Sequence, residues 1–230
     1  MNANSHAIVD QAITSRRSVR AFLPTPVPRA TVEELLSIAS RAASGTNVQP
    51  WLVHVVTGAA KERLAAEIAT VFNDPVALAA HQSEFQIYPS QWVPPYIDRR
   101  RKVGWDLYGL LGIGKGEHER THAQHARNYK FFDAPIGFIF TVDRSFGYAA
   151  WIDYGMFMAN LMTAARARGL HTCPQFAFAQ FHRIIAENLK LASEHKVICG
   201  MSLGHEDTSA IENALRSERA PVAEWATFHE

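Results

Sequence analysis

The hydrophobic positions in the first third of the chain recur first with helical spacing and then as a continuous apolar run. Residues 6–15 place apolar side chains on one face, which predicts an amphipathic helix. Thr31 and Glu34 form a T-x-x-E pair, which predicts a capping box at the start of a second helix. Residues 52–57 (LVHVVT) then favour a strand, and the pattern over residues 60–72 predicts a third helix.

The second half of the chain is dominated by long apolar segments. Residues 135–142 (PIGFIFTV) predict a strand covered on both faces, and residues 196–203 (KVICGMSL) predict another apolar strand. Between them, residues 148–165 predict a helix buried on nearly every side, with Gly169 as its C-cap. The pattern also predicts helices over 97–111, 117–132 and 180–189, and a short strand over 170–173.

This order of elements indicates one α+β domain, because no repeat, low-complexity tract or clear linker divides the chain. The residues after Gly204 show little core pattern, so we expect a tail of about two dozen residues that packs on something else, such as a second subunit. The most apolar stretch is interrupted by Asp153 and Asn160, and is too short for a membrane span of ~20 residues. We therefore expect no membrane partner.

Composition narrows the classes of function. The chain has 230 residues with 47% hydrophobic and 20% charged positions, as in an ordinary folded domain. Its net charge of +1 lacks the basic excess that drives nucleic-acid binding, so no nucleic-acid partner is expected. Two cysteines, Cys173 and Cys199, do not form a CxxC motif, and the first residues do not resemble a signal peptide. These features predict a cytoplasmic protein with reduced thiols.

A cluster of cationic side chains follows the first helix. Arg16, Arg17 and Arg20 lie within five residues, with the hydroxyl of Ser18 among them. Several guanidinium groups in a fixed arrangement suit a phosphate dianion. The alternative is a solvated basic helix end that is favoured by the helix dipole.

A second basic pair, Arg216 and Arg219, lies in the tail. This pair could complete an anion site begun by the first cluster. A surface network of ion pairs with Glu212 and Glu218 is the other interpretation, and such networks contribute little stability.

Uncharged amides mark the turn before the first strand, at residues 44–51 (SGTNVQPW). Asn47 and Gln49 each offer a hydrogen-bond donor and acceptor, which suits the edge of a heterocycle or a polyol chain. The other interpretation is a helix C-terminus followed by a tight turn. His118 and His122 match H-E-x-x-H, but polar neighbours and Arg120 argue against a zinc site, so no metal is expected.

Four segments taken together resemble the nitroreductase family of FMN-dependent oxidoreductases. They are R-R-S-V-R-x-F at Arg16–Phe22, A-A-S-G-T-N-V-Q-P-W at Ala42–Trp51, G-M-S-L-G-H-E-D at Gly200–Asp207 and R-S-E-R-A-P at Arg216–Pro221. Each motif is weak, but their order and spacing span the whole chain and make the match specific. The segment Arg41–Ala43 stands where an Ala-Pro is commoner in the family, which is a mild departure.

The resemblance implies a nitroreductase-like α+β fold in which helices flank a central mixed β-sheet. It implies an intertwined homodimer with two FMN sites at the subunit interface. Residues 1–230 would form one domain, and the tail, at about 205–230, would wrap around the partner subunit.

The resemblance also assigns site residues. Arg16, Arg17, Ser18, Arg20 and Arg219 would hold the FMN phosphate and ribityl chain, and Ser44, Gly45 and Asn47, with Gln49, would reach the flavin from the other subunit. Pro174, Gln175, Phe176 and Ala177 would lie along the isoalloxazine edge and donate a backbone N–H near flavin N5. Several family members have Glu-Gly where this chain has Phe176-Ala177, and Ser217 replaces a family lysine for which Arg216 would compensate.

The resemblance implies a ping-pong mechanism, in which donor and acceptor bind in turn. NADPH or NADH passes a hydride to the flavin, and a small aromatic acceptor then takes two electrons from the same face, so that no side chain acts as the catalyst. A nitro group would go to nitroso and then to hydroxylamine. The aromatic residues of the helical insert, Trp92, Tyr96, Trp105 and Tyr108, are the candidates for the acceptor pocket, and we expect about half of them to reach it.

Other functions remain open at this level. The insert and R-N-Y-K-F-F-D-A-P at Arg127–Pro135 look most like the branch that includes nitrobenzoate and dinitroaniline reductases. The same site could serve a quinone or free-flavin reductase, or a reductive dehalogenase. A flavin-binding sensor without turnover is a more remote alternative, and a zinc hydrolase built on His118 and His122 is a third class.

Overall fold

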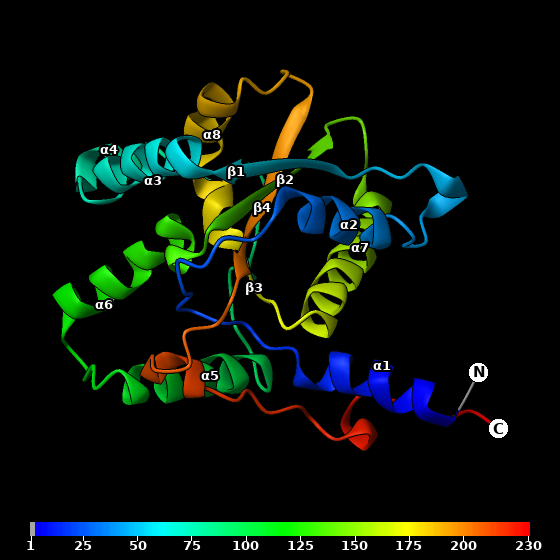
Figure 1. Ribbon diagram of the computed structural model, residues 1–230. Helices are drawn as coiled ribbons and strands as arrows, with labels where there is room; N and C mark the ends of the chain where they lie inside the picture. The colour runs from blue at the N-terminus through cyan, green and yellow to red at the C-terminus, as the bar shows by residue number, and fades with distance from the viewer. Residues whose placement is uncertain (1–2) are drawn as a thin grey trace.

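A four-stranded antiparallel sheet forms the centre of the protein, which is described by a computed structural model over residues 3–230 (Figure 1). Its strands follow the order β1-β2-β4-β3, and every neighbouring pair is antiparallel. The strands are β1 (Leu52–Thr57), β2 (Ile136–Asp143), β3 (His171–Gln175) and β4 (His195–Gly204). The α+β class is therefore confirmed. Where the resemblance implied a mixed sheet, parallel pairing over residues 3–230 is limited to a single bridge, Ser18 with Thr172.

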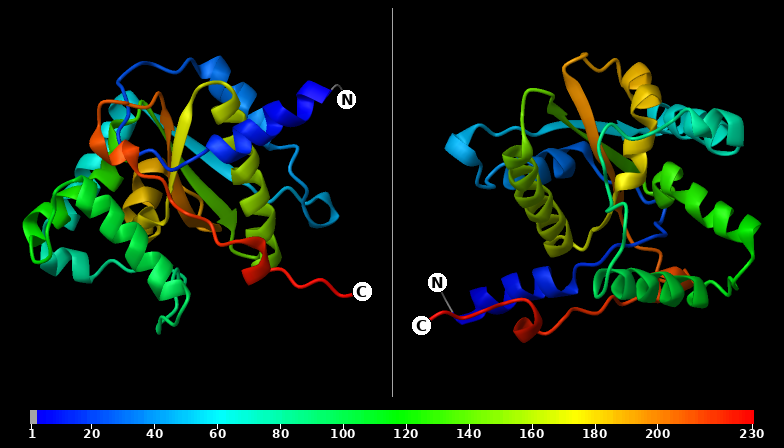
Figure 2. Two further views of the ribbon diagram at one scale, coloured as in Figure 1. Left: turned by 90° about the horizontal axis from the view of Figure 1, so that it is seen from below. Right: turned by 180° about the vertical axis from the view of Figure 1, so that it is seen from behind.

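Helices cover both faces of this sheet (Figures 1 and 2). Their order and bounds agree with most of the predicted helices, and α4 was not predicted. The helices are α1 (Ala3–Ser15), α2 (Arg29–Ala39), α3 (Gly58–Phe72), α4 (Pro75–Ala79), α5 (Tyr96–Leu110), α6 (His118–Ala126), α7 (Tyr148–Ala167) and α8 (His182–Leu189). Short 3-10 turns are η1 (Gly45–Asn47), η2 (Arg127–Asp133), η3 (Phe176–Phe181), η4 (Ile211–Ala214) and η5 (Val222–Glu224).

The predicted capping box at the start of α2 is wrong. The helix begins at Arg29, because the carbonyl of Pro28 already accepts a hydrogen bond from the backbone N–H of Thr31 (3.0 Å). Thr31 and Glu34 therefore lie inside the helix. The Glu34 carboxylate instead accepts a hydrogen bond from Arg168 (2.6 Å), which ties α2 to the end of α7.

The helix predicted over residues 117–132 is wrong in its second half. Helix α6 ends at Ala126, and the chain then turns through η2, where Phe131 and Phe132 have φ angles of +54° and +51°. Both phenylalanines are buried, as is Tyr129. Packing of these rings into the core overrides the helical preference of the segment, and the left-handed backbone is the geometry that allows it.

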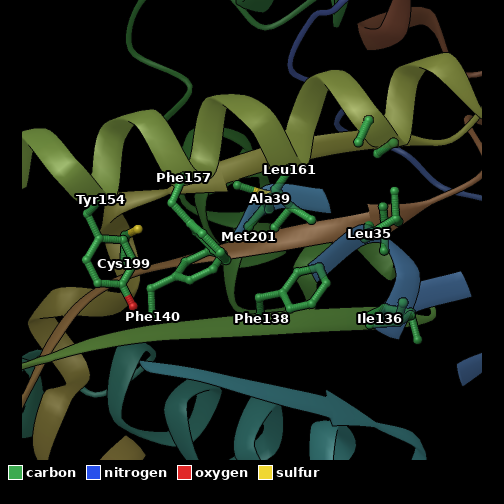
Figure 3. Close-up of a cluster of buried hydrophobic side chains, with 14 of the residues drawn as sticks. Leu35, Ala39, Ile136, Phe138, Phe140, Tyr154, Phe157, Leu161, Cys199 and Met201 are labelled. Atoms are coloured by element: carbon green, nitrogen blue, oxygen red, sulfur yellow. The ribbon is translucent and has the colours of Figure 1, made fainter. Parts of the chain in front are cut away.

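One side of the sheet packs against α2 and α7 (Figure 3). Phe138 and Phe140 of β2 lie beneath Tyr154 and Phe157 of α7 in this cluster. The buried Tyr154 hydroxyl accepts a hydrogen bond from the Leu52 N–H (2.9 Å) and donates to a carbonyl of the sheet. These contacts fix the position of α7 relative to strands β1 and β2.

The other side of the sheet carries a second aromatic cluster. Phe131 stacks on Phe178 with ring centroids 4.5 Å apart, and the backbone of Gly200 lies directly beneath Phe178. A Cβ at position 200 would lie 2.4 Å from a Phe178 ring carbon. Gly200 is therefore required by close approach of a buried ring to strand β4.

We expect the substitution Gly200→Ala to lower the free energy of unfolding by about 1–3 kcal/mol, because the fully buried Phe178 cannot move away from the added methyl group. Urea unfolding followed by far-UV circular dichroism measures the change. The matched control is Gly109→Ala in helix α5, where the new Cβ meets nothing within 4 Å. Equal stability of the two variants would contradict this account of the core.

The prediction that the long helix is buried on nearly every side is wrong for the single chain. Tyr148, Ile152 and Met156 of α7 follow one another at intervals of four residues and are 91%, 68% and 36% exposed. This spacing places them on one stripe of the helix. An exposed apolar stripe of this kind is a candidate surface for contact with another protein. No helix within residues 3–230 is long and apolar enough to cross a membrane.

Candidate active site

The N-terminal basic segment is threaded between three parts of the fold. The Val19 N–H donates to Thr172 O of β3 (3.1 Å), and the Phe22 N–H donates to Phe132 O of η2 (3.2 Å). The Leu23 N–H donates to His205 O, just beyond β4 (2.9 Å). These backbone bonds hold residues 16–23 at the edge of the sheet, next to the start of the C-terminal tail.

Asn213 ties this segment to the tail. Its buried amide accepts a hydrogen bond from the Arg20 N–H (2.8 Å) and donates to the carbonyls of Ala21 and Asp207 (both 2.8 Å). Glu212 is also buried, and it pairs with a guanidinium group of η2. The expectation that the chain lacks core contacts beyond Gly204 is therefore wrong as far as about residue 215. Sequence reasoning missed Asn213, because only the fold shows which carbonyls it reaches.

The two basic clusters of the sequence meet at one cavity of about 660 Å³, which we call the arginine cavity. The segment after α1 and the tail line two of its walls, and the last turn of α7 contributes a third. Arg166 of that turn was missed by sequence reasoning, and its Nε donates to Ser15 Oγ (2.9 Å). The cationic lining residues are Arg16, Arg17, Arg166, Arg216 and Arg219.

These guanidinium groups are mostly unpaired. Within residues 3–230, Arg16, Arg166, Arg216 and Arg219 have no carboxylate within 4 Å. Burial, and then repulsion from Arg219, lower the pKa of Arg16. Such a concentration of uncompensated positive charge favours a bound dianion.

Arg17 differs from the other members of the cluster. One of its terminal nitrogens is paired with the buried carboxylate of Glu206, whereas its Nε is buried without a hydrogen-bond partner. A buried N–H donor without a partner is costly, and an anion in the arginine cavity would satisfy it. The residues present therefore fit a phosphate group at this place.

A second cavity, of about 640 Å³, lies between α5, η2 and the turn from β3 into η3. We call it the aromatic cavity, because rings from four segments line it. Pro174, Gln175, Phe176 and Ala177 form one wall. The aromatic side chains of the lining are Tyr88, Trp105, Tyr108, Phe132 and Phe176.

The wall at the turn from β3 into η3 is rigid. The buried Gln175 amide donates to Asn128 O (2.7 Å), and its oxygen accepts a hydrogen bond from Ser202 Oγ (2.8 Å). Gln175 thus serves the backbone rather than a ligand. The N–H groups of Phe176 and Ala177 begin the 3-10 turn, where amides lack partners inside the helix.

The insert aromatics divide into two groups. Trp105 and Tyr108 line the aromatic cavity, and burial raises the pKa of the Tyr108 hydroxyl. Trp92 and Tyr96 do not line it: Tyr96 is exposed, and Trp92 packs beneath the guanidinium of Arg100. Other residues that line the cavity were not anticipated from the sequence: Tyr88, Arg100, Arg101, Gln124, His125 and Asn128.

The amide-rich loop at residues 44–49 is not part of either cavity. It lies on the far side of α7 from α5 in every view (Figures 1 and 2). Its Gly45 N–H points to the carboxylate of Asp153 (3.3 Å), and Asn47 and Gln49 have φ angles of +60° and +49°. The fold of one chain therefore brings Arg16 and Arg219 together but leaves Ser44, Gly45, Asn47 and Gln49 apart from them.

The second histidine of the H-E-x-x-H motif, His122, has structural contacts. His122 stacks on Phe72 with centroids 4.4 Å apart, and its Nε2 lies 2.9 Å from Asn73 Oδ1. Over residues 3–230, no three His, Cys, Asp or Glu side chains group closely enough to hold a metal ion.

Two histidines near the cavities predict a pH dependence of stability. Burial and then His122 lower the pKa of His125, and burial lowers the pKa of His171 despite the opposing Glu206. Between their ordinary pKa of 6.5 and these lowered values, the unfolded chain binds more protons than the folded one. The free energy of unfolding is therefore expected to fall as the pH falls below about 6.5. Urea unfolding at pH 7.5, 6.5 and 5.5 checks this. A free energy of unfolding that is the same or greater at pH 5.5 than at pH 7.5 would contradict it.

Comparison with known proteins gives concordant matches. The model of the nitroreductase family matches residues 13–205. The chain is 42% identical to a 4-nitrobenzoate reductase of Pseudomonas putida over 220 residues, covering 95% of this chain and 94% of that one. It is 36% identical to a nitrobenzene nitroreductase of Ectopseudomonas oleovorans, covering 96% of each.

Two similar solved structures are also nitroreductases. The FMN- and NADPH-dependent nitroreductase NfnB of sphigopyxis sp. strain HMH superposes with a TM-score of 0.91 at 32% identity, over 96% of this chain and 99% of that one. The FMN-dependent nitroreductase NfnB of Mycobacterium smegmatis, solved with NADPH, superposes with a TM-score of 0.92 at 28% identity, over 98% and 100%. The likeness thus covers the whole fold, including the insert that walls the aromatic cavity.

Proposed function

The chain belongs to the nitroreductase family, and from this premise we propose that it is an FMN-dependent NAD(P)H oxidoreductase that reduces nitroaromatic compounds. The observation that carries the proposal is the pair of adjoining cavities. One is lined by guanidinium groups most of which have no carboxylate partner and the other by aromatic rings, and the segment 16–20 contributes to both. Relatives named as nitroaromatic reductases support the choice of acceptor.

We place the anionic end of FMN in the arginine cavity. Arg16, Arg17 and Arg219 would bind its phosphate, with Arg216 and Arg166 adding positive charge. Ser18 and Arg20, in the same clamped segment, would contact the ribityl chain. The isoalloxazine edge would lie along Pro174–Ala177, because these residues line the aromatic cavity and the Gln175 side chain holds their backbone in place.

When bound, FMN supplies two-electron hydride chemistry, accepting a hydride from NADPH or NADH and passing it to the acceptor. The side chains of this protein orient the two substrates, stack them and limit water. The nitro group takes up two electrons and two protons and loses water to give the nitroso compound, and a second pair of each gives the hydroxylamine. Because one cavity serves donor and acceptor in turn, ping-pong kinetics are expected.

We propose that the working form is a homodimer in which residues 1–230 form one domain. The apolar stripe Tyr148, Ile152 and Met156 of α7 supports a helix that packs against a second copy. The loop at residues 44–49 would then reach the partner's flavin, and the end of the tail, after Glu224, would wrap around the partner. Free, buried Cys173 and Cys199 support a reducing compartment such as the cytoplasm.

A complementation experiment tests the shared site. Asn47→Ala and Arg219→Ala would each damage both sites of a homodimer, but from opposite subunits. Random mixing of the two variants should restore one intact site in each mixed dimer, or about a quarter of all sites. Flavin content after co-expression and gel filtration measures this recovery. No recovery, with mixed dimers present, would contradict the assignment of Asn47 to the partner's site.

The proposed reaction is tested by following the flavin spectrum without oxygen. The purified protein should be yellow, lose its colour on adding NADPH or NADH, and regain it when a nitroarene is added. Liquid chromatography should then detect the hydroxylamine. A protein that binds FMN but is not bleached would be a flavin sensor, and turnover confined to quinones, free flavin or halogenated phenols would replace nitroarene reduction by one of the alternatives.

A further inference from the structure

Four consecutive cationic residues of α5, Arg99 to Lys102, are divided by the helix into two pairs. Arg99 lies 3.0 Å from Glu224, and Lys102 lies 3.3 Å from Glu218, both carboxylates of the C-terminal tail. Lys102 also contacts Asp106 (2.9 Å). The outer pair is thus neutralised by acidic side chains.

The inner pair has no such partner. Within residues 3–230, Arg100 and Arg101 have no carboxylate within 4 Å, and both line the aromatic cavity. The Arg100 guanidinium stacks over the ring of Trp92 at 4.9 Å, which holds it in place without neutralising it. Arg101 shares its helix face with Trp105, four residues later, which lines the same cavity.

The rest of the aromatic cavity lacks negative charge. Its lining includes Arg20 and His125 but no aspartate or glutamate. The protein as a whole has a net charge of +1, so this one-sided lining is a local feature. Focused positive charge beside aromatic walls favours a ligand that is flat and anionic.

We propose that Arg100 and Arg101 bind an ionised carboxylate on the aromatic acceptor, so that the preferred substrates are nitroarenes that carry a carboxylate. Planar guanidinium groups match a carboxylate with two parallel hydrogen bonds, and a neutral nitroarene of the same shape leaves them unsatisfied. The inference rests on the proposed function, because it names the substrate class of the same site. Arg100 and Arg101 act as specificity-determining residues and take no part in the electron transfer.

The test compares 4-nitrobenzoate with the neutral 4-nitrobenzamide in the FMN-loaded protein. We expect Arg101→Gln and Arg100→Gln each to lower kcat/KM for 4-nitrobenzoate by about 10- to 100-fold, the range for a lost charge-assisted hydrogen bond. The value for 4-nitrobenzamide should stay within about twofold, and Arg101→Lys should retain part of the preference. Added NaCl should reduce the advantage of the carboxylate in the unmodified protein.

The matched control is Arg99→Gln, which removes the same charge from the neighbouring position of α5. Arg99 faces Glu224 and does not line the aromatic cavity, so kcat/KM for both acceptors should be unchanged. If Arg99→Gln lowers kcat/KM for 4-nitrobenzoate as much as Arg101→Gln does, the loss is caused by the changed net charge of the helix and not by a contact with the carboxylate. That result would overturn the proposal.

A second readout separates this inference from the proposed reaction. Benzoate and benzamide, which cannot be reduced, are titrated into the oxidised protein while the flavin absorbance is followed. Tighter binding of benzoate that is lost in Arg101→Gln supports the inference even if no nitroarene is turned over, in which case only the proposed function fails. Equal affinity for the two ligands would overturn the inference while leaving nitroarene reduction intact.

The phosphate of NADPH offers the same anionic chemistry from another source. If the variants raise KM for NADPH but not for NADH, and leave the preference for 4-nitrobenzoate unchanged, the two arginines serve the 2′-phosphate of the donor. That outcome also overturns the proposal. Unchanged KM for both nicotinamides, together with the loss for 4-nitrobenzoate, supports it.

Discussion

Replacing Arg219 by alanine is expected to weaken FMN binding by about 1.5–3 kcal/mol, roughly tenfold to a hundredfold in Kd, through loss of charge-assisted hydrogen bonds to the phosphate. The fold should be unaffected. Among the residues that the structure describes, Arg219 donates only to its own stretch of the tail, to Ser217 O (3.2 Å), Ser217 Oγ (2.9 Å) and Glu218 O (2.8 Å).

The measurement is a titration of the apoprotein with FMN, followed by quenching of flavin fluorescence. Arg183→Ala removes an exposed guanidinium from α8, away from both cavities, and should leave the Kd unchanged. Arg16→Ala should weaken binding as Arg219→Ala does. Unchanged affinity in both site variants would refute the assignment of the phosphate to the arginine cavity.

Replacing Arg17 by alanine is expected to damage the fold as well as FMN binding. The side chains of Arg17 and Glu206 are only 19% and 8% exposed, so the substitution leaves a buried carboxylate without its cation. Breaking such a pair costs about 3 kcal/mol or more of the free energy of unfolding. Sequence alone treats Arg17 and Arg219 as equivalent phosphate ligands, whereas the structure separates their effects.

Urea unfolding of the apoprotein measures the cost without a contribution from the cofactor. The double variant Arg17→Ala/Glu206→Gln should regain much of the stability, because the orphaned charge is gone, but it should not regain FMN affinity. His171, whose Nε2 lies 3.4 Å from Glu206, is not mutated in either variant. Equal urea midpoints for Arg17→Ala and the unmodified protein would show that the pair contributes no stability.

Much of the fold could be predicted from the apolar pattern. The runs at residues 135–142 and 196–203 form β2 and β4. They could be predicted because a strand that is covered on both faces is apolar at nearly every position. The basic segment after α1 was singled out from neighbouring positions in the same way, as three arginines within five residues, and its binding of a phosphate stays a prediction. These are signals carried by neighbouring positions in the sequence.

Features that depend on distant residues could not be predicted. Thr31 looked like a cap, but the carbonyl of Pro28 had already begun the helix. Arg166 and Asn213 give no sign in the sequence of their roles, because each acquires its partners only when α7, β3 and the tail are assembled. Phe131 adopts a left-handed backbone for the same reason, since burial of its ring outweighs the local preference.

The loop at residues 44–49 shows a different limit. Its amides were singled out from the sequence as candidate flavin ligands, yet the folded chain holds them apart from Arg16 and Arg219. The role proposed for them depends on a second copy of the chain, and no pattern within a single sequence reports the distance between subunits. The resemblance to a family supplied that expectation, and the complementation experiment is its direct test.

The stretch from Arg216 to Glu224 lines the arginine cavity and also contacts helix α5, other residues of which line the aromatic cavity. Arg216 and Arg219 line the cavity that we propose for the phosphate, while Glu218 and Glu224 contact Lys102 and Arg99 of α5. Because Glu218 is the neighbour of Arg219 and contacts Lys102 of α5, an FMN phosphate that orders Arg219 would also restrain the helix behind the acceptor, and such a coupling would be reciprocal. An aromatic acid held in dialysis buffer should therefore slow the escape of the yellow nucleotide.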